Sequence, residues 1–125
     1  MTPRRILITS FGSYGDVFPY LGLALGLKER GHRPVLAMPP FYRTLVKEEG
    51  IDFASVRPDV NPHDRETVAR IMDARRGTEF IVRDVILRSL RDTHADLAAA
   101  AADADLVVSH PITFAAPVVA QHRGI

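Results

Sequence analysis

The sequence lacks cysteine altogether, and it has neither a long apolar run nor a clear excess of one charge. The absence of cysteine excludes disulfide bonds, cysteine-based zinc sites and a thiol nucleophile. No apolar run approaches the ~18 residues that a membrane-spanning helix needs. The apolar run 6–8, which follows Arg4 and Arg5, is too short for the core of a signal peptide. We therefore expect a soluble, cytoplasmic domain.

Charge and composition restrict the class of protein further. Sixteen Lys and Arg residues stand against fifteen Asp and Glu residues, for a net charge of +1. Because a nucleic-acid-binding face requires a clear basic excess, we expect no nucleic-acid partner. Hydrophobic residues make up 46% of the 125 residues and charged residues 25%, as in one ordinary globular domain. Fourteen of the basic residues are arginine, a bias typical of GC-rich bacterial genomes.

Apolar runs and turn residues predict strands that alternate with helices. The predicted strands are residues 5–9, 34–38, 51–56 and 106–109; the predicted helices are residues 17–30, 41–49, a pair between 64 and 102 broken at Gly77, and 112–123. Such alternation produces a parallel sheet with helices on both faces. We therefore predict an α/β fold, a Rossmann-like doubly wound sheet of order 3-2-1-4-5, whose fifth strand lies beyond Ile125.

The helix predicted after the first strand carries further expectations. Asp16 is expected to cap its N-terminus, and Pro19 is expected in its first turn. Because glycine is unfavourable inside a helix, Gly22 and Gly26 are expected to form a bare face packed closely against the sheet. The charged segment 63–96 is expected to form solvated helix faces and no binding patch.

Two loops are expected to meet between the first and fourth strands, where the strand order reverses and ligands bind doubly wound sheets. The loops are residues 11–16 and 110–113, and the candidates in and beside them are Ser10, Ser13, Tyr14, Asp16, Ser109 and His110. The first loop does not match G-x-G-x-x-G, and the second strand ends in Met38 and Pro39 without an acidic residue. No Gly-Lys-Ser/Thr motif is present. These features disfavour a dinucleotide fold and a P-loop.

The first loop and its surroundings resemble the start of the GT-B glycosyltransferases that act on lipids, sterols and antibiotic aglycones. The residues that carry the resemblance are Gly12-Ser13-Tyr14-Gly15-Asp16-Val17-Phe18-Pro19, Arg30-Gly31-His32 and Pro39-Pro40-Phe41. The variant Phe18-Pro19-Tyr20 is most similar to bacterial rhamnosyltransferases of glycolipid synthesis. The resemblance implies that residues 1–125 are an N-terminal acceptor-binding domain. The donor, a UDP- or dTDP-hexose, would bind a C-terminal domain absent from this sequence.

The resemblance also implies roles for individual residues. Asp16 matches the catalytic base, which takes the proton of a lipid or small-molecule hydroxyl as this hydroxyl attacks the anomeric carbon with inversion. His110 is the expected partner of Asp16 or a proton carrier. The residues expected to bind the acceptor are Gly12, Ser13, Tyr14, Gly15, Phe18 and Pro111. No metal or cofactor is implied for this domain, and the chain alone is expected to be inactive.

Each candidate also has an interpretation without catalysis. Asp16 can be a helix cap and nothing more, and His110 an ordinary loop residue. His32 is expected to hydrogen-bond a turn, and the other histidines have no partner at metal-ligand spacing. Tyr14 and Phe18 suit a core or a cavity rim. The apolar stripe of residues 80–90 suits a core, or in the family comparison a wall of an apolar acceptor pocket.

Two other functions stay open. The chain could be a non-enzymatic or split-subunit module that recruits a separate donor-binding chain, or a flavodoxin-like binding module. Peripheral contact with a membrane is compatible with a lipid acceptor. The unpaired edge of the fourth strand predicts that the isolated chain self-associates.

Overall fold

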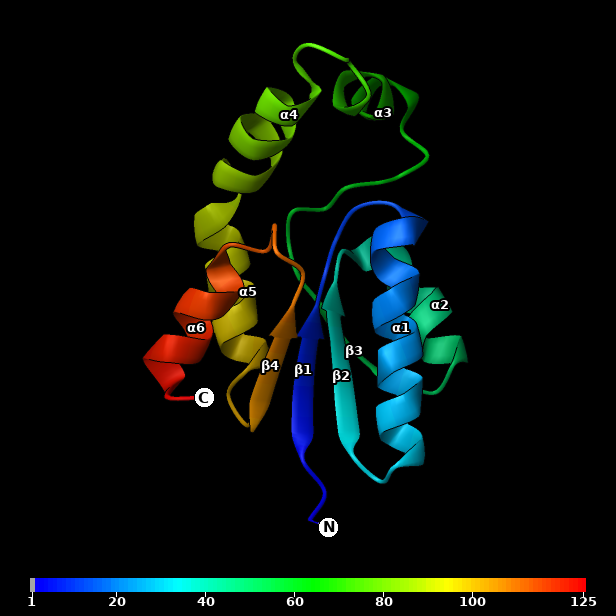
Figure 1. The fold of residues 1–125 in the computed structure, drawn as a ribbon, viewed down its shortest axis with the longest axis vertical. Helices are drawn as coiled ribbons and strands as arrows, with labels where there is room; N and C mark the ends of the chain where they lie inside the picture. Colours follow the sequence, from blue (N-terminus) through cyan, green and yellow to red (C-terminus); the bar gives the residue numbers. More distant parts are fainter. Residues whose placement is uncertain (1) are drawn as a thin grey trace.

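A parallel sheet lies between two layers of helices in the computed structural model, which describes residues 2–125 (Figure 1). The strand order is β3-β2-β1-β4, and every pairing is parallel. The strands are β1 (Arg5–Thr9), β2 (Arg33–Met38), β3 (Asp52–Ser55) and β4 (Leu106–Ser109). This arrangement confirms the predicted Rossmann-like, doubly wound α/β fold and its first four strands.

The helices cover the two faces of the sheet in pairs. Ile6 and Ile8 of β1 pack with α1 and α2 on one face, whereas Leu7 and Val35 pack with α5 and α6 on the other. Strands that are apolar on both sides must be buried on both faces, so the strand sequences themselves enforce this arrangement. The helical elements are α1 (Tyr14–Glu29), a 3₁₀ turn (Pro40–Tyr42), α2 (Arg43–Glu48), α3 (Arg65–Ile71), α4 (Gly77–Glu79), a π-helix (Phe80–Leu87), α5 (Leu90–Ala100) and α6 (Ala115–Arg123).

The segment between β3 and α5 extends beyond the carboxyl ends of the strands, where Figure 1 shows α3 and α4. The single helix predicted for residues 78–102 is wrong, because α4, the π-helix and α5 follow one another there. Val82, Ile86 and Leu90 recur at helical spacing through this stretch, so the apolar pattern gave no sign of the change. At Gly77 a Cβ would collide with the carbonyl oxygen of Ile71, so only glycine lets α4 begin this close to the end of α3.

Three expectations about α1 are wrong. Ser13 is the N-cap, so Asp16 is the third residue of the helix, and Pro19 lies inside the helix instead of in its first turn. The Asp16 carboxylate reaches back to the Ser13 amide, which extends the helix towards the loop. Gly22 is exposed with no atom within 4 Å of a Cβ built there, and Gly26 would meet only Arg30. These glycines therefore do not pack on the sheet.

The beginning of α6 also differs from the prediction. The helix begins at Ala115 instead of Ile112, because the amide of Thr113 first closes a turn onto the carbonyl of His110. Its end is as predicted, with Gly124 in the left-handed region at φ 72°.

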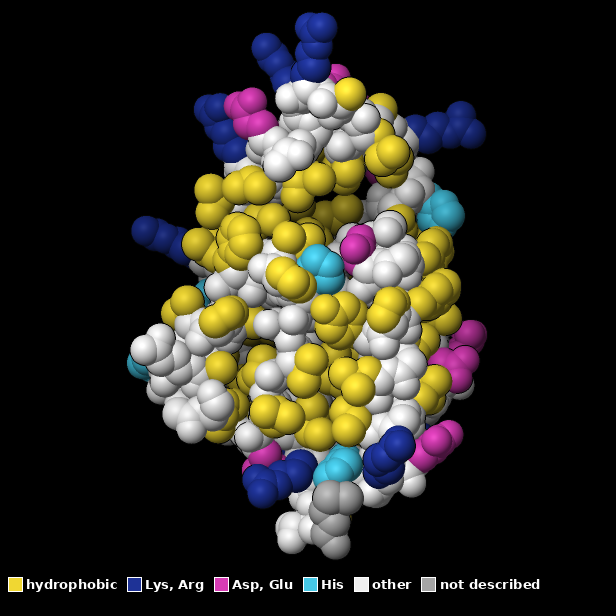
Figure 2. Space-filling model, viewed as in Figure 1, with side chains coloured by type: hydrophobic (Ala, Val, Ile, Leu, Met, Phe, Trp, Pro, Cys, Tyr) yellow, Lys and Arg dark blue, Asp and Glu magenta, His cyan; other side chains and the backbone are white. Residues whose placement is uncertain are grey.

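β4 forms one edge of the sheet and pairs with β1 alone within residues 2–125. The side chain of Leu106 on this strand is exposed, and Figure 2 shows hydrophobic side chains over this part of the molecule. Among the residues described, no helix has the length and apolar composition needed to cross a membrane.

Candidate functional site

The loop after β1 holds the side chain of Asp16 in one orientation. The backbone N–H and the hydroxyl of Ser13 both donate to Asp16 Oδ2, at 2.9 and 3.0 Å. The Ser10 hydroxyl donates to the Asp16 carbonyl oxygen at 2.8 Å. Gly12 has a φ of +118°, and a Cβ built there would lie 2.5 Å from Asp16 Oδ2. Both the backbone and the available space therefore require glycine at this position.

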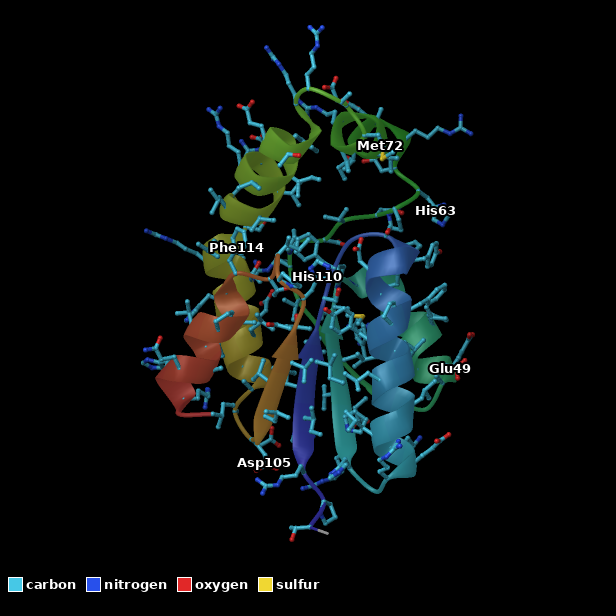
Figure 3. All side chains as sticks on the ribbon, viewed as in Figure 1. Glu49, His63, Met72, Asp105, His110 and Phe114 are labelled. Carbon is cyan, nitrogen blue, oxygen red and sulfur yellow. The ribbon has the colours of Figure 1, made fainter. Side chains whose placement is uncertain are left out.

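His110 lies beside Asp16, so the two predicted loops do meet. Its Nε2 atom is 3.6 Å from Asp16 Oδ1, the carboxylate oxygen that Ser13 leaves free. Its Nδ1 atom accepts the backbone N–H of Ile112 at 3.2 Å. Because an accepting ring nitrogen carries no proton, the neutral ring has its proton on Nε2, facing Asp16. Figure 3 shows His110 just beyond the arrowhead of β4, between α1 and the loop that carries Phe114.

An apolar cavity of about 300 Å³ lies beside Asp16. Figure 2 shows a hollow with hydrophobic walls between the α3–α4 region and the ends of the strands. Gly12, Ser13 and Asp16 form its wall on the side of the sheet. The other lining residues are mostly apolar, and apart from Phe11 they come from four further segments: Phe11, Val60, Asn61, Pro62, Val68, Ile71, Met72, Ile81, Val85 and Ile112.

The expectation that residues 63–96 form only solvated helix faces is wrong. The charged side chains of this segment lie on its outer faces, but its apolar residues line the cavity because the segment folds over the carboxyl ends of the strands. The family comparison had implied an apolar pocket wall between residues 80 and 90, and Ile81 and Val85 occupy such a wall.

Four of the residues expected to bind the acceptor do not line this cavity. Tyr14 and Phe18 lie on α1 with their rings stacked at 5.3 Å, and they are 37% and 50% exposed. The Tyr14 hydroxyl lies 3.2 Å from Nε2 of His63, which Figure 3 shows beside the start of α1. Gly15 is the second residue of α1, and Pro111 follows His110. These four residues could contact an acceptor molecule only if that molecule extends beyond the cavity.

Tyr42 belongs to the site although sequence reasoning did not select it. Its side chain is fully buried, and its hydroxyl donates to the carbonyl oxygen of Gly12 at 2.5 Å. Burial, together with the nearby Tyr14 and Asp16, raises the pKa of Tyr42 to about 12, so the hydroxyl keeps its proton. The sequence gave no signal for this contact, because the burial of Tyr42 and its approach to Gly12 follow from the packing of distant segments.

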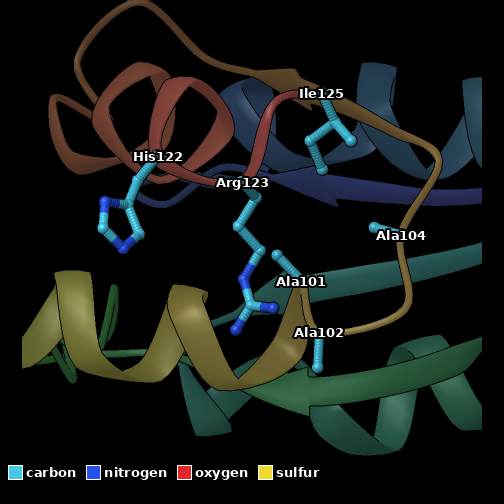
Figure 4. Close-up of a pocket in the computed structure, with 6 residues that line it drawn as sticks. All are labelled: Ala101, Ala102, Ala104, His122, Arg123 and Ile125. Atoms are coloured by element: carbon cyan, nitrogen blue, oxygen red, sulfur yellow. The ribbon is translucent and has the colours of Figure 1, made fainter.

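The amino ends of the strands hold a second hollow of about 360 Å³ between the ends of α5 and α6 (Figure 4). Its walls are Ala101, Ala102, Ala104, His122, Arg123 and Ile125, and it contains no predicted site residue. His32 lies at the same end of the sheet, and its ring accepts the Arg4 N–H at 3.2 Å, so its contact is to the segment before β1 instead of to its own turn. Within residues 2–125, no group of three or more His, Asp and Glu side chains is arranged to hold a metal ion.

The chain is similar to glycosyltransferases over nearly its whole length. The sequence model of the glycosyltransferase family 28 N-terminal domain matches residues 6–124. A sterol 3-beta-glucosyltransferase of Aspergillus fumigatus is 46% identical over 55 residues, which are 44% of this chain and 4% of that protein. The O-mycaminosyltylonolide 6-deoxyallosyltransferase of Streptomyces fradiae is 40% identical over 55 residues, or 44% of this chain and 13% of that enzyme.

Solved structures share the fold. The glycosyltransferase SsfS6 of Streptomyces sp. SF2575 superimposes with a TM-score of 0.74 at 23% identity, over 98% of this chain and 37% of that one. The same glycosyltransferase has also been solved in complex with thymidine diphosphate. The present chain therefore spans well under half of each of these proteins.

Proposed function

The chain belongs to the glycosyltransferase family 28 N-terminal domains, and we propose that it is the acceptor-binding domain of an inverting glycosyltransferase. The enzyme transfers a hexose from a nucleotide-sugar to a hydroxyl group of a lipid or small-molecule aglycone. The observation that carries this proposal is the Asp16 carboxylate in the wall of an apolar cavity. The reacting hydroxyl group of a substrate bound in this cavity would lie beside the Asp16 carboxylate, which can take its proton.

The cavity suits an acceptor with an apolar body and few polar groups. Its volume of about 300 Å³ lies at the lower end of the range for small-molecule sites. Its polar side chains are Ser13, Asp16 and Asn61, and apolar residues form the rest of the wall. Burial of an apolar body supplies affinity, and the carboxylate selects the hydroxyl group that reacts. The sterol and O-mycaminosyltylonolide named for two relatives are acceptors that support this view.

Asp16 Oδ1 is the atom to which the proton of the acceptor would move. Ser13 occupies Oδ2 with two hydrogen bonds, so Oδ1 is the oxygen left to accept a proton. As the proton leaves, the acceptor oxygen forms a bond to the anomeric carbon of the donor. The bond from this carbon to the diphosphate oxygen breaks, the diphosphate keeps the electron pair, and the configuration inverts. Fixing the carboxylate in advance lowers the entropic cost of this step.

His110 acts as the partner of Asp16 and not as a proton carrier. The amide of Ile112 occupies Nδ1, so the Nε2–H of the neutral ring faces Asp16 Oδ1. A second proton on the ring would require the hydrogen bond to Ile112 to break. The separation of 3.6 Å between Nε2 and Oδ1 is longer than a hydrogen bond, so the ring does not occupy Oδ1 as Ser13 occupies Oδ2. Through Nε2–H the ring presents a donor to the charged carboxylate, which is the role expected of a partner.

The donor site belongs to another part of the enzyme. We expect a UDP- or dTDP-hexose to bind a C-terminal domain, since a homologous structure contains thymidine diphosphate and is much longer than this chain. The present chain alone is then inactive but still binds the acceptor. Four expected acceptor-binding residues lie at the start of α1 or directly after His110, outside the cavity lining: Tyr14, Gly15, Phe18 and Pro111. They would contact the parts of an acceptor that extend beyond the cavity.

The decisive experiment replaces Asp16 by Asn in the full-length glycosyltransferase. We expect kcat to fall by at least about 100-fold, as for loss of a general base, while the KM for the acceptor stays nearly constant. Asp52→Asn is the matched control, because Asp52 is exposed at the opposite end of the sheet. An Asp16→Asn enzyme that keeps most of its kcat would show that Asp16 only orders the start of α1.

Binding to the 125-residue chain tests the acceptor site separately. A fluorescent apolar aglycone should bind the wild-type chain, and Val85→Phe should weaken binding because the larger ring fills the cavity. Binding that is unaffected by Val85→Phe would place the acceptor elsewhere. Transfer that appears only when a second polypeptide is added would support the split-subunit alternative.

A further inference from the structure

The peptide group that joins Gly12 to Ser13 is held at both of its ends. Its carbonyl oxygen accepts the Tyr42 hydroxyl at 2.5 Å, and its N–H donates to Asp16 Oδ2 at 2.9 Å. Because a peptide group is planar, the orientation of its carbonyl determines that of its N–H. Tyr42 and Asp16 are therefore connected through one rigid unit, although they lie on different elements of the fold.

The Gly12–Ser13 peptide needs such a connection because glycine does not restrain it. This peptide turns through ψ of Gly12 and φ of Ser13, and glycine, which has no Cβ, restricts its ψ little. A rotated peptide would turn its carbonyl oxygen towards the Asp16 carboxylate and its N–H away. Two oxygens with negative charge would then face each other, and Oδ2 would lose one of its two donors from Ser13.

Tyr42 is well suited to hold this peptide. Its side chain is fully buried in the core cluster that contains Val17 and Val46. The edge-to-face contacts with Tyr14 and Phe41, at centroid distances of 5.9 and 5.1 Å, fix the plane of the ring. The raised pKa of Tyr42 keeps the hydroxyl protonated, and therefore a donor, near neutral pH.

We propose that Tyr42 is a positioning residue for the catalytic base: it locks the Gly12–Ser13 peptide so that the Ser13 N–H holds Asp16 Oδ2 and Oδ1 stays directed at the acceptor. This proposal rests on the proposed role of Asp16 as base. Tyr42 does not line the cavity and has no contact with the acceptor. Its loss should therefore lower kcat and leave substrate binding intact.

The first test is Tyr42→Phe in the full-length glycosyltransferase, which removes the hydroxyl and keeps the ring. We expect kcat to fall about tenfold, the scale of one hydrogen bond, with both KM values within about twofold of the wild type. The control is Val46→Ala, which weakens the same core cluster but touches neither Gly12 nor Asp16. This control should lower thermal stability and keep kcat, whereas an unchanged kcat in Tyr42→Phe would overturn the proposal.

A double variant separates positioning from general damage. In an Asp16→Asn enzyme there is no base to position, so Tyr42→Phe should cause no further loss of kcat. An equal loss in both backgrounds would overturn the proposal. If Asp16→Asn is itself fully active, the proposed function fails, and the following measurement still decides the role of Tyr42 in the loop.

NMR of the 125-residue chain provides that measurement without an activity assay. The Ser13 amide proton should move upfield in Tyr42→Phe, because it loses its hydrogen bond to the Asp16 carboxylate, and it should stay unchanged in Val46→Ala. A Ser13 amide signal that Tyr42→Phe leaves in place would show that the peptide does not depend on Tyr42.

Discussion

Replacing Gly12 by Ala tests the loop geometry most directly. The added Cβ would lie 2.5 Å from Asp16 Oδ2, and alanine would have to adopt a φ of +118°. An unfavourable backbone conformation of this kind costs about 1–3 kcal/mol. Displacing the carboxylate also weakens its hydrogen bonds from Ser13, at a further cost of about 1 kcal/mol. Gly12→Ala should therefore lower the free energy of unfolding by about 2–4 kcal/mol.

Gly22→Ala is the matched control with the opposite sign. Gly22 is exposed inside α1, and a Cβ built there has no atom within 4 Å. Alanine at such a position should stabilise the domain by about 0.5–1 kcal/mol. Thermal and urea unfolding of the 125-residue chain, followed by circular dichroism, measures both effects. The Tm of Gly12→Ala should fall by roughly 10 °C. A Gly12→Ala variant as stable as the wild type, or two variants that shift in the same direction, would refute this reasoning.

Two further predictions concern other parts of the fold. Arg57 binds both carboxylate oxygens of Asp96 at 2.9 and 3.0 Å and lowers its pKa. The pair therefore stabilises the protein above the usual pKa of a carboxyl group and loses its contribution as the pH falls through the lowered pKa. In urea unfolding, Asp96→Asn should reduce stability at pH 7, and this difference should shrink as the pH falls through the lowered pKa of Asp96, where the wild-type carboxyl takes up a proton. A difference that stays constant with pH would contradict this. The unpaired edge of β4 should make the concentrated 125-residue chain self-associate, which light scattering would detect, and Leu106→Lys should abolish this association. A wild-type chain that stays monomeric would contradict the prediction.

The strands could be predicted from the sequence because burial on two faces demands a continuous apolar run. Residues 5–9, for instance, form β1 with the predicted bounds, and four of the five are buried. Helix ends were less predictable, since the capping contact that begins α1 joins Ser13 to Asp16 and depends on the shape of the loop. Gly22 and Gly26 were misplaced because glycine spacing does not reveal which face of a helix is exposed.

For the site, the sequence by itself determined the two loops and the candidates Asp16 and His110, because the position where strand order reverses follows from the alternation of strands and helices. Only the tertiary structure decided what surrounds them. The cavity wall comes from residues 60–85, and the hydroxyl of Tyr42 reaches Gly12 across thirty positions of the chain. An apolar or aromatic residue in a sequence indicates that a side chain will be buried, but its neighbours are fixed only when distant segments pack against one another.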